Sequence, residues 1–579
     1  MEKERNFHNY LRLWNFLSHR RKIQFYLLLI LIVLTSLSEV ISLGALLPFL
    51  GVLIAPEKIF EISFLKDIWV LFDLTSPNQL LLPITVLFAV GALVAGGMRL
   101  LLLYVSTRLT FAMSADISLE IYRRTLYQPY SVHIARNSAD VISSIMGKSN
   151  GVVYYTISPL MTLATSLIIL TVIMATLIMF NPMISLVVFC IFGSFYLFVA
   201  LRSKTRLQRN GKVANDNIAL LQRALQEGLG GIRDVLIDGS QRFYVNIYQR
   251  ADIPYRKSLG DNIYISTSPR YTMESLGMAI MAVFAYRLSE TTGSLISIIP
   301  LLGALAMGAQ RMLPVLQQAY TAWSNLKIGT STLGDVLDLL DQPLPRFATE
   351  PDPPAMPFQK EIRLESVSYH YNSNSKIVLD HLSITIPKGG RVGIVGKTGS
   401  GKSTLLDLIM GLIDPTEGKL FIDGIELNAD NLRSWQRNIA HVPQFIYLSD
   451  NSIAENIALG VTKENIDLAR VRRAAEKAQI ANYIESLPLK YDEQVGERGV
   501  RLSGGQRQRI GIARALYKEA SVIVFDEATS ALDVETEKAV MGAIEGLGRE
   551  LTILMIAHRL STVEKCEQII ELESGKIKR

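Results

Sequence analysis

The 579-residue chain has little cysteine and little charge, and each of these shortages excludes some classes of protein. Its two cysteines, Cys190 and Cys566, are too few for a disulfide framework or a cysteine-ligated metal site. We interpret both as small apolar residues. Charged residues make up only 19% of the chain, against 49% hydrophobic residues. This balance is unusual for a soluble protein, so a membrane portion is expected.

The N-terminus does not have the pattern of a cleavable signal peptide. Residues 1–22 are charged and amphipathic, and they predict an interfacial helix that leads into a first membrane span. The net charge of +6 is compatible with nucleic-acid binding or with basic cytoplasmic loops. We favour the second interpretation and expect no nucleic-acid partner.

Long apolar runs occur only in the first 320 residues or so and predict an all-α domain of six spans over residues 23–340. The predicted spans are 23–55, 80–105, 157–180, 183–201, 271–288 and 295–314. Lysine and arginine concentrate between spans two and three and between spans four and five. By the positive-inside rule these two loops and both termini are cytoplasmic. Both loops look helical, so spans two to five are expected to continue as helices into the cytoplasm.

A proline-rich linker is predicted at residues 341–358, where six prolines rule out a regular helix. Residues 359–579 alternate apolar strand-like runs with helical stretches, which indicates a soluble α/β domain.

A phosphate-binding loop is predicted at the start of this domain. It follows an apolar strand at 392–395, opens a helix at Thr404 and fits G-x-x-x-x-G-K-[ST] with Gly396, Lys397, Thr398, Gly399, Ser400, Gly401, Lys402 and Ser403. Glycines let backbone N–H groups turn towards phosphate oxygens, and the helix N-terminus adds partial positive charge. Lys402 would contact the β- and γ-phosphates of ATP, and the Ser403 hydroxyl would bind Mg²⁺. A plain glycine-rich turn is the alternative, which the flanking strand and helix disfavour.

A second apolar strand, 522–525, ends in two carboxylates. Asp526 is predicted to hold Mg²⁺, directly or through water, and Glu527 to orient and polarise the attacking water. Without the phosphate-binding loop upstream, a solvated strand end would be the better interpretation.

The segment Leu502, Ser503, Gly504, Gly505 and Gln506 resembles the signature of the ATP-binding-cassette (ABC) ATPases. The resemblance implies further roles: Gln444 as the Q-loop glutamine and metal ligand, His558 as the switch histidine, and Tyr371 as the aromatic residue that stacks on adenine. It also implies a D-loop at 530–533, an exporter-specific segment at 495–499, and coupling helices near 130–135 and 239–247. His558 or Tyr371 alone would be better explained by packing, but together these residues occur in the family's order.

One phosphate-binding loop and one signature per chain imply that two complete ATP sites require two chains, because in this family the signature completes the partner's site. A homodimer is the simplest interpretation, and a heterodimer with a similar chain stays open.

We expect ATP-driven alternation between inward-facing and outward-facing cavities. An ATP-gated channel or regulator is disfavoured because Glu527 and His558 are both present, and a soluble repair or translation ATPase is excluded by six spans.

The membrane domain resembles bacterial flippases for polyprenyl-pyrophosphate-linked oligosaccharides, at short stretches around 39–49, 91–99, 269–274 and 311–314. This predicts a lipid-linked oligosaccharide as substrate and the bacterial inner membrane as location, with a general lipid, drug or peptide exporter as the alternative. An arginine in a span is costly and marks a pathway or a partner. Arg99, Arg270 and Arg311 are therefore predicted to meet the substrate's pyrophosphate. The alternatives are interfacial snorkelling for Arg270 and Arg311, and pairing of Arg99 with Glu39 or Glu274.

Overall fold

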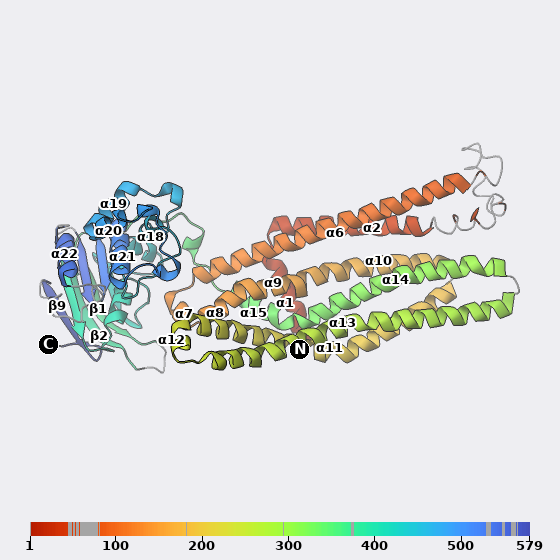
Figure 1. Cartoon of the computed structure of the whole chain (residues 1–579), viewed down its shortest axis with the longest axis horizontal. Helices are drawn as coiled ribbons and strands as arrows, with labels where there is room; N and C mark the ends of the chain where they lie inside the picture. The colour runs from red at the N-terminus through yellow and green to blue at the C-terminus, as the bar shows by residue number, and fades with distance from the viewer. Residues whose placement is uncertain are drawn as a thin grey trace. The chain divides into compact units, whose positions relative to one another are not determined.

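The computed structural model describes residues 2–44, 49, 52–53, 57, 79, 81–180, 182–292, 295–371, 376–527, 534–546, 551–556, 563 and 566–578. The chain divides into two compact units. The first consists of Met1–Gln128 and Ala135–Leu344, and the second of Pro129–Ile134 and Pro345–Arg579. The predicted fold class, a helical membrane domain followed by an α/β domain, is confirmed (Figure 1).

The first unit is built from helices, several of them much longer than a membrane is thick. Helix α1 is followed by α2, and the long helices α6, α10, α11, α13 and α14 pack alongside one another (Figure 1). Their bounds are Glu2–Phe16 (α1), His19–Gly44 (α2), Leu81–Leu126 (α6), Ser158–Phe180 (α10), Pro182–Gly230 (α11), Gln241–Thr292 (α13), Leu295–Ile328 (α14) and Thr330–Leu340 (α15). The prediction that spans continue as helices beyond the bilayer is confirmed for α6, α11 and α13.

Among the described residues, three helical segments are long and apolar enough to cross a membrane: His19–Glu39, Leu81–Leu126 and Asp140–Ala175. They cover most of the helical parts of predicted spans one to three. Helices α11, α13 and α14 run through predicted spans four to six. Most of span one beyond Gly44, most of the loop that follows it, and Asn181 of the turn between spans three and four lie outside the described residues.

The helix that leads into α10 switches twice from α-helical to π-helical hydrogen bonding. Helices α8 (Ser138–Ile142) and α9 (Ser149–Val152) alternate with the π-helical turns η3 (Ser143–Lys148) and η4 (Val153–Ile157). Lys148 contacts Asp335 of α15 at 2.7 Å, and Asn215 of α11 donates to the same carboxylate at 3.0 Å. These contacts fix α15 against α11 and against the irregular helix that leads into α10.

The C-terminus of α15 is capped by side chains from α6 and the residues just beyond it. Arg124 donates to the carbonyls of Leu340 and Gln342, and Gln128 donates to that of Pro343. Because the last carbonyls of a helix have no partner within it, these bonds define where the helix ends. The 341–358 segment that follows contains only the 3₁₀ turn Arg346–Ala348 (η5).

The second unit contains two sheets. The antiparallel sheet has the order β2-β1-β4-β5, and the mainly parallel sheet has the order β10-β9-β3-β8-β7-β6. Their bounds are Glu361–Tyr369 (β1), Leu379–Pro387 (β2), Arg391–Gly396 (β3), Glu417–Ile422 (β4), Ile425–Glu426 (β5), Ile439–Val442 (β6), Val522–Asp526 (β7), Thr552–Ile556 (β8), Gln568–Glu573 (β9) and Lys576–Ile577 (β10). Strands β7 and β8 are almost wholly buried, as expected of parallel strands covered on both faces.

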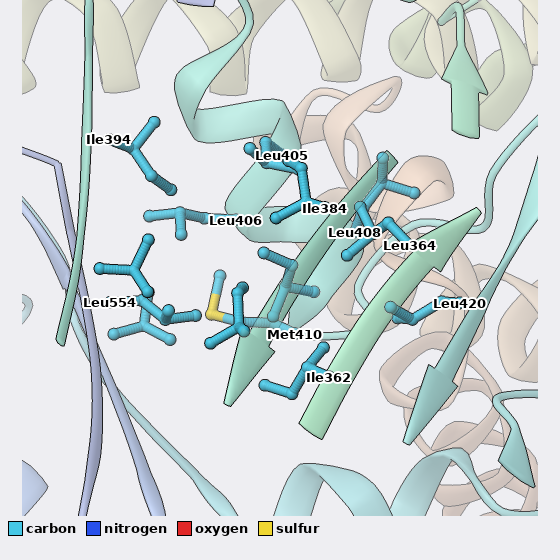
Figure 2. Packing of buried hydrophobic residues seen from close by; sticks show 14 of the residues in the cluster. Ile362, Leu364, Ile384, Ile394, Leu405, Leu406, Leu408, Met410, Leu420 and Leu554 are labelled. Carbon is cyan, nitrogen blue, oxygen red and sulfur yellow. The ribbon is translucent and has the colours of Figure 1, made fainter. Parts of the chain in front are cut away.

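Helix α16 (Lys402–Ile409) is held in the hydrophobic core between the two sheets (Figure 2). Leu405, Leu406 and Leu408 of this helix pack with residues of β1, β2, β3, β4 and β8, and Trp435 of α17 (Leu432–Arg437) joins the same cluster. A second core lies against the parallel sheet and includes residues of α18 (Ile453–Ile457), α19 (Leu468–Lys477), α20 (Ala481–Glu485), α21 (Gly504–Lys518) and α22 (Val534–Glu545). Burial of α16 on this scale fixes the loop that precedes it.

Candidate ATP site

Parallel pairing brings the ends of four strands to one edge of the sheet. Ile394 of β3 pairs with Ile556 of β8, and Ile556 pairs with Asp526 of β7. On the other side of β7, Phe525 pairs with Val442 of β6, two residues before Gln444. Because the carboxyl ends of neighbouring parallel strands meet, the predicted loop, carboxylates and glutamine share one edge, the usual ligand edge of such sheets.

The loop between β3 and α16 needs glycine at two positions. Gly396 has φ +152° and Gly401 has φ +101°, conformations that residues with a side chain rarely adopt. A Cβ at Gly396 would also collide with the Leu572 carbonyl, and one at Gly401 would lie 2.6 Å from Leu379 Cδ2. The buried Lys402 donates to the carbonyls of Gly396 at 2.9 Å and Lys397 at 3.1 Å. The ammonium therefore lies inside the loop where phosphates are expected.

The residues of the loop fit a bound phosphate chain. The hydroxyl of Ser400 is buried and has no hydrogen-bond partner among the described residues, although buried polar groups are normally paired. A phosphate oxygen would satisfy it. Thr398, Gly399 and Ser403 complete the turn, with Gly399 at φ +80°.

The two carboxylates after β7 have different surroundings. Burial, followed by the charge of Glu527, raises the pKa of Asp526, and Lys402 acts in the opposite direction. Glu527 has the left-handed φ of +50°, an uncommon conformation that occurs preferentially at functional sites. Its carboxylate accepts a hydrogen bond from Gln444 Nε2 at 2.7 Å. The structure therefore places the predicted water-activating residue beside the predicted metal ligand.

The donor set is suited to Mg²⁺ held together with phosphates. Among the described residues there is no group of three or more His, Cys, Asp or Glu side chains that could hold a metal. The predicted ligands are one carboxylate, one hydroxyl and one amide, from Asp526, Ser403 and Gln444. Mg²⁺ commonly takes few protein oxygens and completes its shell with water and phosphate, so the set fits.

Tyr371 contacts the first turn of α16. Its ring packs edge-on against Tyr369 with centroids 5.1 Å apart, and its hydroxyl is 3.1 Å from Thr404 Oγ1. The side chain is half exposed, which leaves ring surface available for stacking on a base. His558, the predicted switch histidine, and the predicted D-loop lie outside the described residues.

The signature segment forms the N-terminus of α21. Ser503 Oγ accepts from the Gln506 amide at 3.2 Å, and Gln506 Oε1 accepts from the Ser503 amide at 2.8 Å. This capping box satisfies two amides, and in the described structure the amides of Gly504 and Gly505 make no hydrogen bond. Two unpaired amides at a helix N-terminus can bind an anion. They lie at the start of α21, whereas the chain's own phosphate loop precedes α16.

One residue of the site was missed by the sequence interpretation. Asp407 lies on α16 one turn after Ser403, and its burial and the charge of Asp526 raise its pKa to about 6. The signal in the sequence was a single carboxylate in an otherwise apolar part of the helix. Asp407 and Tyr371 also contribute, after burial, to a raised pKa of Tyr130 in α7 (Tyr130–Ile134). Helix α7 lies in one of the predicted coupling segments and belongs to the second unit.

Two of the three predicted substrate arginines, Arg99 and Arg270, are paired with carboxylates. Arg99 Nε lies 2.8 Å from Oε1 of the buried Glu39, which is one of the alternatives that the sequence left open. Arg270 donates to Glu274 at 2.7 Å, one turn further along α13, and both side chains are half exposed. The Arg311 side chain lies outside the described residues. A role of these arginines in substrate binding stays a prediction.

Comparison with known proteins agrees with this architecture. Residues 379–530 match the ABC transporter family and residues 24–302 match the ABC transporter transmembrane region. A solved structure of a bacterial Atm1-family ABC exporter with ATP bound has the same fold. Its TM-score is 0.76 at 22% identity, covering 97% of this chain and 94% of that one.

Curated relatives match over most of their length. The chain is 32% identical over 432 residues to an ATP-dependent lipid A-core flippase of Polaromonas sp., covering 73% of this chain and 70% of that protein. It is 28% identical over 481 residues to the protein of the same name from Cupriavidus metallidurans, covering 82% and 80%. The chain therefore belongs to the ABC transporter family. It is an integral membrane protein, an ATP-hydrolysing transporter with one transmembrane region and one ATPase domain.

Glu527→Gln is expected to abolish steady-state ATP hydrolysis while ATP binding is retained. The amide keeps the shape and the contact with Gln444 but cannot polarise water, and losing a general base costs about 10²-fold or more. ATPase assays and nucleotide-binding measurements on the purified variant test this. Turnover close to that of the unmutated protein would contradict the assignment.

Asp407→Asn is expected to stabilise the nucleotide-free protein more in alkali than in acid. Because the pKa of Asp407 is about 6 in the folded protein and near 3.8 in the unfolded chain, ionising this carboxyl lowers the free energy of unfolding. The loss is absent below about pH 3.8, grows up to about pH 6 and is complete above that. The thermal unfolding midpoint should therefore rise more at about pH 8 than at about pH 5. Asp414→Asn, at an exposed position, is the control. An equal gain at both pH values would show that ionisation of Asp407 is not the cause.

Proposed function

We propose that two copies of this chain form an exporter that uses ATP to flip an amphipathic glycolipid across the bacterial inner membrane. The observation that supports this most directly is the division of ATP-binding groups within one chain. The loop around Lys402 and the amides of Gly504 and Gly505 both suit phosphate, yet they lie at the starts of two different helices, α16 and α21. A second chain would supply the missing half of each site.

Within one chain, each requirement of ATP hydrolysis has a candidate residue. Lys402 and the loop amides bind the phosphates, and Ser403, Asp526 and Gln444 are the proposed ligands of Mg²⁺, which would neutralise phosphate charge. Glu527, held by Gln444, orients the attacking water. Because Gln444 contacts the base and belongs to the metal set, its position is coupled to the presence of nucleotide.

ATP binding and hydrolysis would switch the dimer between two states. Nucleotide held between the loop of one chain and the signature of the other favours the closed pair, and hydrolysis removes that preference. Helix α7 is the described candidate for passing this motion to the long helices, since it belongs by its contacts to the ATPase unit. The second candidate, residues 239–247, stays a prediction, as does the cytoplasmic location of both termini.

The substrate class rests on two kinds of similarity. The relatives described above are named lipid A-core flippases. Short stretches of the membrane domain resemble flippases of polyprenyl-pyrophosphate-linked oligosaccharides. Both substrates join a lipid to a phosphate-bearing saccharide, and this shared chemistry is the class we propose. An ATP-gated channel would hydrolyse ATP without concentrating or flipping a lipid, so coupled transport separates the two functions.

Mixed dimers test whether the ATP sites are shared. With Lys402→Ala on one chain and Ser503→Ala on the other, shared sites leave one site intact, whereas sites within single chains leave none. With both changes on one chain the outcomes are reversed, because each shared site then has one damaged half. Occlusion of radiolabelled ATP by differently tagged, co-purified chains measures this. Occlusion by the second arrangement and none by the first would overturn the dimer proposal.

A panel of labelled lipids in proteoliposomes tests the substrate. Lipid A-core or polyprenyl-pyrophosphate oligosaccharide should be flipped and should stimulate ATPase activity, whereas a plain phospholipid should do neither. The Glu527→Gln variant is the inactive control. Flipping of the plain phospholipid alone, or of none of the three, would contradict the proposed class.

The same assay tests the arginines. Arg99→Ala leaves a buried carboxylate without its partner, which is destabilising in itself. The double variant Arg99→Ala, Glu39→Gln removes that charge. If Arg99 binds substrate, the double variant should be stable and still flip poorly, with Arg270→Ala and Arg311→Ala showing the same defect. Recovery of flipping in the double variant would mean that Arg99 serves only to pair with Glu39.

A further inference from the structure

Helix α13 contains a proline at a point where the chain would otherwise be a continuous rod. The helix has 52 residues, Gln241–Thr292, and Pro254 and Pro269 lie inside it. Because proline has no amide proton, Pro269 cannot donate to the carbonyl of Ile265 four residues earlier, and its ring pushes that turn open. A helix interrupted in this way can bend at the proline unless something else binds the released carbonyl.

Side chains of α14 bind the backbone at this point. The Tyr320 hydroxyl donates to the Ile265 carbonyl at 3.2 Å, the group that Pro269 leaves without a helical partner. Gln317 Nε2 donates to the next carbonyl, that of Ser266, at 2.7 Å, and Thr321 Oγ1 donates to the same oxygen at 3.3 Å. Tyr320, Gln317 and Ser266 are all buried, so water does not compete for these carbonyls.

Helix α11 orients the two main side chains of this contact. The Tyr196 hydroxyl donates to Gln317 Oε1 at 3.0 Å, and Ser203 Oγ lies 3.2 Å from the Tyr320 hydroxyl. Gln317 also donates to Thr321 Oγ1 at 2.9 Å. Both N–H groups and the oxygen of the Gln317 amide are thus engaged, which permits only one orientation of the side chain.

The hydrogen bonds are concentrated at the proline and are not a general property of this helix pair. Asn262 of α13 and Ser324 of α14, about one turn away, are also buried. Neither Asn262 Nδ2, Asn262 Oδ1 nor Ser324 Oγ has a hydrogen-bond partner in the described structure. Ser266 Oγ, three residues before Pro269, also has no partner in the described structure. The contrast therefore concerns the side chains of α14: Gln317 and Tyr320 bind backbone carbonyls beside the proline, whereas Ser324 binds none.

We propose that Gln317 and Tyr320 are positioning residues that stiffen α13 at Pro269, so that motion of its N-terminal part is transmitted to the part beyond the proline. With the released carbonyl bound by α14, the two helices move together across Pro269. Without that bond the helix is free to bend at the proline. Bending there absorbs the motion, so hydrolysis continues while the segment beyond Pro269 no longer follows. This inference rests on the proposed dimeric switch.

Spin labels on either side of the proline test the transmission. Val245→Cys lies before Pro269 and Met278→Cys lies beyond it, and both positions are exposed. In a background without Cys190 and Cys566, the distance between the labels of the two copies is measured without nucleotide and after trapping with ATP and vanadate. The otherwise unmutated protein should show a shift at both positions. Tyr320→Phe should keep the shift at 245, lose most of it at 278, and retain ATPase activity.

The replacement Pro269→Ala provides the decisive comparison. It restores an amide that can donate to Ile265, so Tyr320→Phe should have little further effect in that background, on the shift at 278 or on the unfolding midpoint. Such non-additivity is the mark of a direct interaction. Tyr264→Phe, an exposed tyrosine of α13, is the matched control and should behave as the unmutated protein does.

The possible results separate this inference from the function on which it rests. An equal effect of Tyr320→Phe in the presence of Pro269 and in the Pro269→Ala background would overturn it, as would a normal shift at 278 in Tyr320→Phe. Absence of any shift at 245 in the otherwise unmutated protein would overturn the dimeric switch and the transmission role together. In that case the midpoint comparison would still decide whether Tyr320 binds the released carbonyl.

Discussion

The parallel register of β3, β8, β7 and β6 is the constraint on which the ATP site depends. Residues from three distant parts of the chain meet only because the strands that precede them run in the same direction and end at one edge. Burial of α16 between the two sheets then sets the height of the phosphate loop relative to that edge. Strand pairing and core packing, rather than contacts among the polar groups, therefore position Lys402, Asp526 and Gln444.

The fold holds the polar groups at this edge in an arrangement that is energetically unfavourable without a ligand. Asp526, Asp407 and Glu527 bring three carboxylates into one partly buried region, and the pKa values of Asp526 and Asp407 are raised by that burial and by like charge. Glu527 also has an unfavourable backbone conformation. Such an arrangement is costly without ligand, and phosphate-bound Mg²⁺ would relieve the excess negative charge. Nucleotide binding and a change in the site are coupled for this reason.

In the membrane unit, long helices are stabilised at the points where their regular backbone hydrogen bonding is interrupted. The π-helical turns near Lys148, the capped end of α15 and the proline of α13 are all interruptions of regular hydrogen bonding. At the α15 end and at Pro269, a neighbouring helix supplies side chains to the interrupted backbone, and near Lys148 an ion pair with Asp335 holds the irregular helix to α15. Long-range transmission through this unit therefore depends on interhelical hydrogen bonds at a few points more than on helix length.

The sequence by itself was sufficient for the features written in consecutive residues. The phosphate loop, the signature, the strand ending in Asp526 and the apolar helices could be recognised because their chemistry depends on local spacing and composition. The tertiary structure decided which side chains touch across the fold. It paired Arg99 with Glu39 rather than Glu274, brought Asp407 towards Asp526, joined Gln444 to Glu527 and placed Tyr320 at the carbonyl released by Pro269. These contacts depend on strand order and on how each helix is rotated against its neighbours. The periodicity of a sequence predicts which face of a helix is apolar, but it does not predict which residue of another element contacts that face.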